Sequence, residues 1–303
     1  MNILKSFFRH LFSKKTFPFS GLSNLSTDEL LALMRHETHR IEKAVYNDIL
    51  VSKKEAFQRK KEKLALIFKI LEDREFPENE PTLLWSKKIY DNFDNLEKEL
   101  KRSGSSQVPE FDTSAAGHFL EFLGKRRSVR VWADKQPDTE ILEKFAYMMI
   151  DAARLSPNSG NRQTWRFVIL KTPEEKKLLE KIKERHCITA PLLIFVGMDT
   201  RLYGALGESE SCLYIDAGAA ILNMILLAHK CGLGTCWNHL GDDIVASREI
   251  NKEIYRRFTR ELNIPAYIAP VAVISIGIPE FIPPVPSRMN IESLMLDKKK
   301  KTR

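Results

Sequence analysis

The densest group of side chains that could bind an anion is the basic run Lys125-Arg126-Arg127-Ser128-Val129-Arg130. Arginine carries a planar set of donors that matches pairs of phosphate oxygens, and a serine hydroxyl adds a neutral hydrogen bond. A basic run by itself is usually a solvated surface. It predicts a phosphate-binding turn only where other ligand-binding stretches accompany it.

A second candidate is the loop SPNSGNRQTWR at residues 156–166, which precedes the strand-like run FVIL. Pro157 and Gly160 break regular structure and leave backbone polar groups free to face a ligand. The side chains that offer both donors and acceptors are Asn158, Ser159, Asn161 and Gln163. Such a set suits the edge of a flat heteroaromatic ring. An ordinary polar loop with Trp165 as a core residue is the alternative that stays open.

Two more stretches could add to a site. In GLGTCWNH, at residues 232–239, Gly232 suits the left-handed position after a helix, and a polar cluster of Trp237, Asn238 and His239 follows. In IGIPEFIPPVPSR, at residues 276–288, a strand-like run leads into rigid prolines that project Arg288. A lone arginine after prolines is common, so this stretch matters only in combination with the other three.

The elements that must position these residues follow from the hydrophobic pattern. Amphipathic spacing predicts a helix over 138–155, and the nearly all-apolar segment 212–230 predicts a helix buried on most sides, of a kind that often packs against its copy in a dimer. Short apolar runs rich in β-branched residues predict strands at 165–170, 191–198 and 271–278. The pattern favours a mixed α/β core.

The part of the chain before this core reads as helical. Residues 26–101 carry apolar side chains at spacings of three and four with no strand-like alternation. Glycine, serine and proline then crowd into a zone that places a boundary between about 102 and 115. We therefore expect an all-helical N-terminal extension, residues 1–112, and a second domain, residues 113–303.

Composition narrows the class of protein. The chain has 303 residues and a net charge of +8, which favours acidic partners without choosing among them. No recognised nucleic-acid-binding motif accompanies the charge, so no nucleic acid is expected. The cysteines are too sparse for a disulfide framework and lack the spacing of a zinc site, which favours a reducing cytoplasm: Cys187, Cys212, Cys231 and Cys236. No metal site is expected.

The N-terminus suggests a surface contact. No stretch offers the ~18 uncharged apolar residues of a transmembrane helix. Residues 1–19 interleave apolar and basic side chains, so they could lie as a helix on the inner face of a membrane or pack against the protein or a partner. The chain is thus expected in the cytoplasm, with peripheral membrane contact as one option.

The four ligand-binding stretches, in this order, resemble the nitroreductase family of FMN-dependent oxidoreductases. The motifs RRSVR, SPNSGNRQTW, DAGAAILNMILLAHKCGLGTCW and IGIPEFIPPVPSR carry the resemblance, which covers about residues 118–296. It implies an α+β fold with a mixed sheet flanked by helices, and a homodimer with two FMN sites at the subunit interface.

The resemblance also implies roles for single residues. Arg126, Arg127, Ser128 and Arg130 match positions that hold the FMN phosphate, ribityl chain and pyrimidine edge. The loop positions that reach over the flavin, typically from the other subunit, are matched by Pro157, Asn158, Ser159 and Asn161. The segment beside the ring is matched by Trp237, Asn238 and His239, and the C-terminal phosphate-binding position by Arg288.

The implied reaction is ping-pong hydride transfer from NAD(P)H through flavin N5 to an organic acceptor, with no residue assigned as nucleophile or general base. The family's loop often ends in Gln-Pro-Trp, whereas Thr164 stands here in place of the proline. The stretch 172–190, which commonly shapes the substrate pocket, is short and offers no clear flavin-contacting lysine or asparagine. The acceptor is therefore not predicted.

Two alternatives stay open beside the oxidoreductase. One is an enzyme that consumes reduced flavin, and the other is a dimeric scaffold that binds a membrane or a partner without catalysis. In the extension, His36 and His39 share a helical face with Arg40 and Lys43. A solvated or interdomain ion-pair face is favoured there over a metal site, because no third ligand is well phased.

Overall fold

The fold is described by a computed structural model that covers residues 19–46, 49–104, 110–204, 206–240 and 252–296. Most of the amphipathic start, the basic C-terminal tail and the breaker-rich residues 105–109 lie outside the described residues. The expectation of membrane contact and the exact domain boundary are therefore predictions still.

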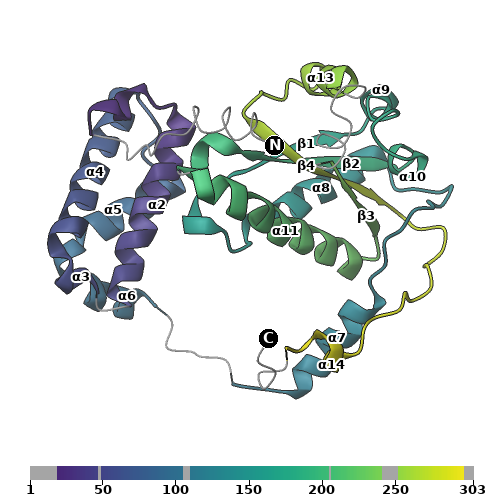
Figure 1. The fold of residues 1–303 in the computed structure, drawn as a ribbon, viewed down its shortest axis with the longest axis horizontal. Helices are drawn as coiled ribbons and strands as arrows, with labels where there is room; N and C mark the ends of the chain where they lie inside the picture. The colour runs from purple at the N-terminus through teal and green to yellow at the C-terminus, as the bar shows by residue number, and fades with distance from the viewer. Residues whose placement is uncertain (1–18, 47–48, 105–109, 205, 241–251, 297–303) are drawn as a thin grey trace, which may run out of the picture.

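The N-terminal part is helical, as the spacing of its apolar residues predicts (Figure 1). In chain order it contains η1 (Phe19–Asn24), α2 (Thr27–Val45), α3 (Ile49–Ser52), α4 (Lys54–Asp73), α5 (Pro81–Asp91), η2 (Phe93–Asn95) and α6 (Leu96–Ser103). These elements enclose a core of their own, which includes Leu30, Met34, Ile41, Leu64, Ile67, Leu71 and Ile89. We call these residues, 19–103, the helical unit.

Helix α2 begins where its sequence provides a cap. Ser26 accepts a hydrogen bond from the backbone N–H of Glu29, and the Glu29 carboxylate accepts one from the backbone N–H of Ser26. This reciprocal pair satisfies two donors that an uncapped helix would leave without partners. Asp28 and Glu29 in the first turn also suit the positive end of the helix dipole. The start of α2 is thus well defined, which matters because its side chains reach the next domain.

The second part of the chain alternates helices and strands. In order it contains α7 (Ser114–Lys125), α8 (Thr139–Arg154), η3 (Ser159–Asn161), β1 (Trp165–Leu170), α9 (Pro173–Lys177), α10 (Arg185–Ile188), β2 (Leu192–Asp199), η4 (Thr200–Tyr203), α11 (Leu206–Lys230), β3 (Gly234–His239), α13 (Lys252–Glu261), β4 (Ile268–Gly277) and α14 (Ile291–Leu294). Both predicted helices and all three predicted strands are confirmed, within three residues except that α11 begins six residues before the predicted start.

The strands form one sheet in the order β1-β2-β4-β3, and each neighbouring pair is antiparallel. Parallel pairing within the described residues is limited to a single bridge between Ser128 and Thr235. The predicted α+β class with a helix-flanked sheet is confirmed. Strand β3 was not predicted, because its glycine, asparagine and histidine resemble a loop in isolation and only pairing with β4 makes it a strand.

Helices cover both faces of the sheet. On one face, α8 and α11 pack against alternate strand residues through Leu142, Met149, Ala217, Ile221 and Met224. On the other face, α13 and the segment between β1 and β2 pack against the intervening strand residues through Leu179, Ile182, Cys187 and Phe258. Burial on both sides explains the continuous apolar run of β2, whose eight residues are all buried.

By length and composition alone, helix α11 could span a membrane over Ser211–Lys230, although no transmembrane helix was expected from the sequence. In the fold, however, Ala217, Ala220, Ile221 and Met224 are fully buried against the sheet. A single helix of this kind is also what the core of a water-soluble domain contains. The structure therefore accounts for its apolar character by packing within the domain.

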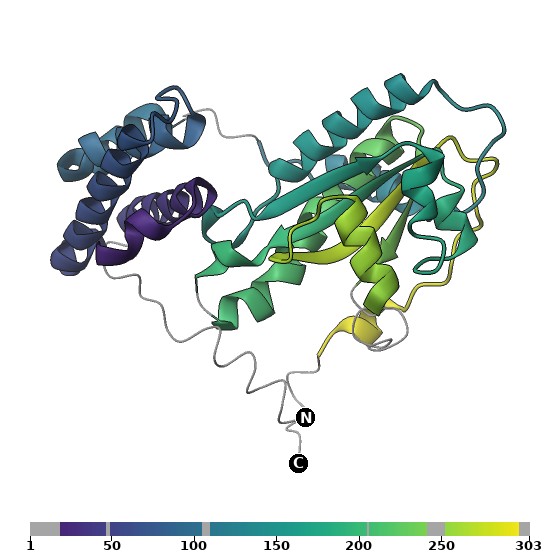
Figure 2. The ribbon, with the colours of Figure 1, turned by 90° about the horizontal axis from the view of Figure 1, so that it is seen from above.

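The helical unit lies beside the α/β part, with α2 facing it (Figures 1 and 2). Beyond β4, the chain leaves the sheet, and α14 lies away from it in both views. Many large apolar side chains of this C-terminal segment are exposed: Phe281, Ile282, Val285, Met289, Ile291, Leu294, Met295 and Leu296. This arm has little to pack against within one protomer.

Candidate functional site

The basic run lies where α7 ends and the chain meets β3. The backbone N–H of Val129 donates to the carbonyl oxygen of Thr235 at 2.9 Å, beside the bridge between Ser128 and Thr235. The approach is close because Gly234 has no side chain: an added Cβ would lie 2.7 Å from a Val129 methyl carbon. The sequence GLGT thus fixes the basic run against the edge of the sheet.

The arginines of this run form a cluster with an arginine distant in sequence. Burial, together with the nearby charges of Arg127 and Arg288, lowers the pKa of Arg126. Within the described part of the chain, none of Arg126, Arg127, Arg130 and Arg288 forms an ion pair with a carboxylate. RRSVR and Arg288 therefore lie close together, and their positive charge has no counterion among the described residues.

A cavity of about 160 Å³ adjoins this cluster and is lined by Arg126, Arg127, Gly232, Gly234, Thr235 and Ile282, among others. The Nε atom of Arg127 is buried and has no hydrogen-bond partner among the described residues. An unpaired buried donor costs about 1–3 kcal/mol and is expected to find a partner. A phosphate oxygen would supply both the missing acceptor and the missing negative charge.

A second cavity, of about 370 Å³, contains the other predicted residues of β3. Arg130, Trp237, Asn238 and His239 line it together with residues that the sequence analysis missed: Lys183, Glu184, His186 and Cys236. Lys183 and His186 belong to the stretch 172–190, in which no flavin-contacting lysine was recognised. Only the tertiary fold brings α10 next to β3.

Asn238 is a structural residue of this cavity. Its side-chain N–H groups donate to Ser275 Oγ at 2.8 Å and to the carbonyl oxygen of Val273 at 3.1 Å, and its Oδ1 lies 3.0 Å from Nε2 of His186. The amide is buried and fully engaged, so it orients His186 at the wall of the cavity. Trp237, by contrast, is 40% exposed and offers a surface to a flat ligand.

The loop 157–163 has an unusual backbone path, as its composition predicts. Gly160, Asn161 and Gln163 have positive φ angles of 61°, 53° and 56°. Asn158 Oδ1 accepts from the backbone N–H of Gln163 at 3.0 Å, and Asp216 of α11 accepts from the N–H of Ser159 at 2.9 Å. Non-glycine residues in this region are strained and often mark functional loops.

Thr164, which replaces the family's proline, has a defined role in this protein. Its hydroxyl lies 2.9 Å from the hydroxyl of Tyr203, which donates to Asp216 at 3.1 Å. Burial raises the pKa of Asp216, while the N–H of Ser159 and the hydroxyl of Tyr203 oppose that shift. The threonine therefore ties the end of the loop to the same carboxyl group that holds its beginning.

The loop and the arginine cluster lie at different ends of α11. The loop contacts Asp216, whereas the arginine cavity is lined by His229 and Gly232. Thirteen residues of helix, from 216 to 229, correspond to about 20 Å. No hydrogen bond or ion pair joins the loop to Arg126, Arg127 or Arg288 in the described part of one protomer. One subunit does not close both groups around a single ligand.

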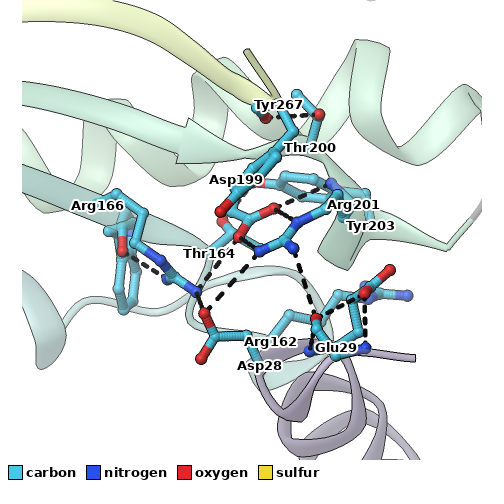
Figure 3. A network of polar contacts seen from close by, with 12 residues as sticks. Asp28, Glu29, Arg162, Thr164, Arg166, Asp199, Thr200, Arg201, Tyr203 and Tyr267 are labelled. Atoms are coloured by element: carbon cyan, nitrogen blue, oxygen red, sulfur yellow. Dashed lines mark hydrogen bonds and ion pairs between the residues drawn. The ribbon is translucent and has the colours of Figure 1, made fainter. Parts of the chain in front are cut away.

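The helical unit contacts the α/β part directly, near the ends of strands β1 and β2. Figure 3 shows a polar network in which Asp28 of α2 lies 3.2 Å from Arg166 Nη2 of β1. Arg166 and Arg201 both pair with the fully buried Asp199, at 3.4 and 2.6 Å. The network ties the start of α2 to the ends of β1 and β2. The helical unit and the α/β part are therefore joined by charged groups, not by an apolar seam alone.

The histidine motif of α2 lies at the same interface. His36 Nε2 is 3.4 Å from Arg162 Nη2 in the loop, whereas Arg40 is exposed. The interdomain alternative fits His36. Within the residues that the structure describes, no three His, Cys, Asp or Glu side chains form a group that could hold a metal.

Acid should weaken the fold through His36. Burial and the positive charge of Arg162 lower the pKa of His36 to about 4. Arg40 and Lys60 add smaller shifts in the same direction, and the negative charge of Glu37 opposes them. The unfolded state, with a histidine pKa of about 6.5, takes up the proton first as the pH falls, so stability is lost between these values. Between pH 7 and 5, we expect the free energy of unfolding measured in urea to fall by about 1–2 kcal/mol less in His36→Gln than in the wild type. Identical losses would contradict the assignment.

Comparison with known proteins shows the family. The family model described as "Nitroreductase family" matches residues 123–188 and 178–278. A protein of Methanothermobacter thermautotrophicus, named "Putative NADH dehydrogenase/NAD(P)H nitroreductase", is 31% identical over 165 residues, which cover 53% of this chain and 76% of that protein. A protein of Archaeoglobus fulgidus with the same name is 30% identical, and the matched region covers 53% of this chain and 85% of that protein.

Among solved structures, an FMN-dependent nitroreductase of Clostridium difficile R20291 is 26% identical, with a TM-score of 0.45. That comparison covers 60% of this chain and 98% of the other. The family match spans residues 123–278, about half of the chain, and includes the basic run, the loop and β3. The chain belongs to the nitroreductase family.

Proposed function

We propose that this protein is an FMN-dependent oxidoreductase that takes reducing equivalents from NAD(P)H and passes them to an organic acceptor. The observation that carries the proposal is the arginine cluster of Arg126, Arg127 and Arg288, which has no carboxylate partner among the described residues. A protein does not gather unpaired arginines around a cavity for stability, because their mutual repulsion opposes folding. A phosphate-bearing cofactor would neutralise them.

The residues present fit FMN. Arg126, Arg127 and Arg288 would hold the phosphate, with Ser128 as a neutral donor beside them. Trp237 and Arg130 line the second cavity, into which the flavin ring would extend. When bound, FMN would supply the two-electron chemistry, by ping-pong hydride transfer through N5. The protein's own groups bind and orient the cofactor, and the positive charge of Arg130 favours the anionic reduced ring.

The proposal includes a homodimer with two interface sites. Ile215 and Leu222 of α11 are exposed, and with Ala219 and Leu226 they recur at spacings of four, three and four residues along one helix face. Such a stripe is typical of helix pairing. A second copy of α11 would cover it, and the exposed apolar C-terminal arm would have a partner surface to pack on. The loop 157–163 of one subunit would then contact the flavin of the other.

Alanine at position 126 should weaken FMN binding about 30-fold. A charge-assisted hydrogen bond contributes about 1.5–3 kcal/mol, and 1.4 kcal/mol corresponds to tenfold in affinity. Titration of the apoprotein with FMN, followed by flavin fluorescence, would measure the change for Arg126→Ala. The control is Arg256→Ala, an exposed arginine on α13. Equal affinity of both variants would place the phosphate elsewhere.

The first test of the function is the visible spectrum of the purified protein. Bound FMN should give a visible absorption band, and the band should bleach when NADH or NADPH is added without oxygen. Release of the chromophore by heat and mass spectrometry would identify it. A colourless protein that also fails to take up added FMN would overturn the proposed function and would favour a scaffold.

A further inference from the structure

We propose that helix α2 of the helical unit is part of the flavin site, because it holds the loop 157–163 in its strained conformation. Arg35 and His36 are its positioning residues. This inference rests on the proposed function, and it gives the helical unit a role in the reaction that the nitroreductase domain carries out. Three contacts, at Arg162, Gly160 and Thr82, support it.

Arg35 links the loop to the interior of the helical unit. Its guanidinium donates to the carbonyl oxygen of Arg162 through Nε at 3.3 Å and Nη2 at 3.0 Å, and to Thr82 Oγ1 through Nη1 at 3.1 Å. Thr82 lies in the first turn of α5. One half-buried cation thus joins α2, α5 and the loop, and the planar geometry of its donors restricts where the loop carbonyl can lie.

His36 fills the space beside Gly160. A Cβ added to Gly160 would lie 2.3 Å from His36 Nδ1, so the imidazole ring packs directly on the loop backbone. His36 Nε2 lies 3.4 Å from Arg162 Nη2, and that guanidinium can only donate. Arg162 Nη1 in turn donates to the carbonyl oxygen and the hydroxyl of Ser159 at 3.1 and 3.2 Å. The ring and the guanidinium together brace the turn.

The loop needs such a brace because its conformation is costly. Asn161 and Gln163 both have positive φ angles, a conformation that residues with side chains keep only where the surroundings stabilise it. Asp216 holds one side of the loop from α11, and α2 holds the other. Between these supports, Pro157 stays exposed. The loop is therefore fixed on the side of its own subunit and free on the edge that could meet a ligand.

The test compares two arginines that make similar contacts. Arg35→Met removes the guanidinium but keeps a flexible apolar stem. Arg74→Met removes a guanidinium that likewise donates to backbone carbonyl oxygens, those of Ser23 and Leu25, but only inside the helical unit. For the full-length dimer, Arg35→Met should raise the FMN dissociation constant about tenfold and shift the visible flavin spectrum, whereas Arg74→Met should change neither.

A rescue experiment keeps the proposal testable if Arg35→Met does not fold. Gly160→Ala should weaken FMN binding because the new methyl group meets His36. His36→Ala removes that ring, so Gly160→Ala should weaken FMN binding less in the His36→Ala background than in the wild type. The backbone strain of alanine at a positive φ is the same in both backgrounds and cancels in this comparison.

The outcomes distinguish a failure of the proposed function from a failure of the inference about α2. A wild type that binds no FMN would overturn the proposed function, and this inference with it. A wild type that binds FMN, with an affinity and spectrum unchanged in Arg35→Met, would overturn the inference alone. For the rescue pair, an equal effect of Gly160→Ala with and without His36 would show that α2 does not position the loop.

Discussion

Ile215→Glu is expected to convert the dimer into a monomer and to release the flavin. In one protomer Ile215 is 69% exposed, so a glutamate there costs the fold little. In a symmetric dimer the same residue would be covered from both copies, and each carboxylate would be buried without a partner. Desolvation of an unpaired charge costs several kcal/mol, which corresponds to more than about a 1000-fold loss of dimer affinity.

The measurement is light scattering coupled to size exclusion, followed by the flavin content of each peak. Leu84→Glu is the matched control, because Leu84 is 56% exposed on α5 of the helical unit. It should stay dimeric and coloured. If Ile215→Glu gave a dimer that retained FMN, the stripe on α11 would not be the interface. A monomer that retained FMN would show that one subunit holds the cofactor by itself.

The elements of the α/β part could be predicted where one residue pattern dominates. The run 192–198 is apolar throughout because both faces of β2 are covered, and α8 shows a clear amphipathic period. Strand β3 has no such signal. Gly234 is suited to this strand because Val129 can approach it closely. The side-chain amide of Asn238 donates a hydrogen bond to a residue of the neighbouring strand. These reasons exist only in the tertiary structure.

The same distinction applies to the site. Arginine is suited to phosphate by its own chemistry, so the run from Arg126 to Arg130 could be recognised from sequence, and burial beside Arg288 agrees with it. His186 and Lys183 could not be recognised, because their position depends on how the short connection between β1 and β2 folds over β3. Residue type predicts what a side chain can bind, whereas the fold decides which side chains meet.

There is a further reason why the contact between α2 and the loop could not be predicted from the sequence. Arg35 and Arg162 are 127 residues apart, and two arginines in a sequence suggest repulsion. The structure resolves this, because the guanidinium of Arg35 binds the backbone carbonyl of Arg162 and not its side chain. Buried charges inside the helical unit therefore affect how α2 holds that loop. Substitution of the most buried of these charges is expected to cause the largest loss of stability.

Glu37→Gln is expected to lower the free energy of unfolding by about 3 kcal/mol, since removal of the carboxylate leaves two partly buried like charges, Lys60 and Lys63, without a counterion. Glu37 is 4% exposed, and its carboxylate pairs with Lys60 and with Lys63, at 2.8 Å for the latter. Burial raises its pKa, but the two ammonium groups outweigh that and lower it. A lowered folded pKa means that this stability is present above the unfolded value of about 4.3 and is lost in more acidic solution.

Glu97→Gln tests whether burial causes the effect. Glu97 also forms an ion pair with a lysine of the helical unit, Lys101, at 2.7 Å, but both side chains are exposed and solvent screens them. Urea unfolding near neutral pH should show a large loss for Glu37→Gln and almost none for Glu97→Gln. Added salt should weaken the exposed pair further and leave the buried one nearly unchanged. Equal losses for both variants would mean that Lys60 and Lys63 reach water once Glu37 is neutral, and that the buried charge does not hold α2 against α4.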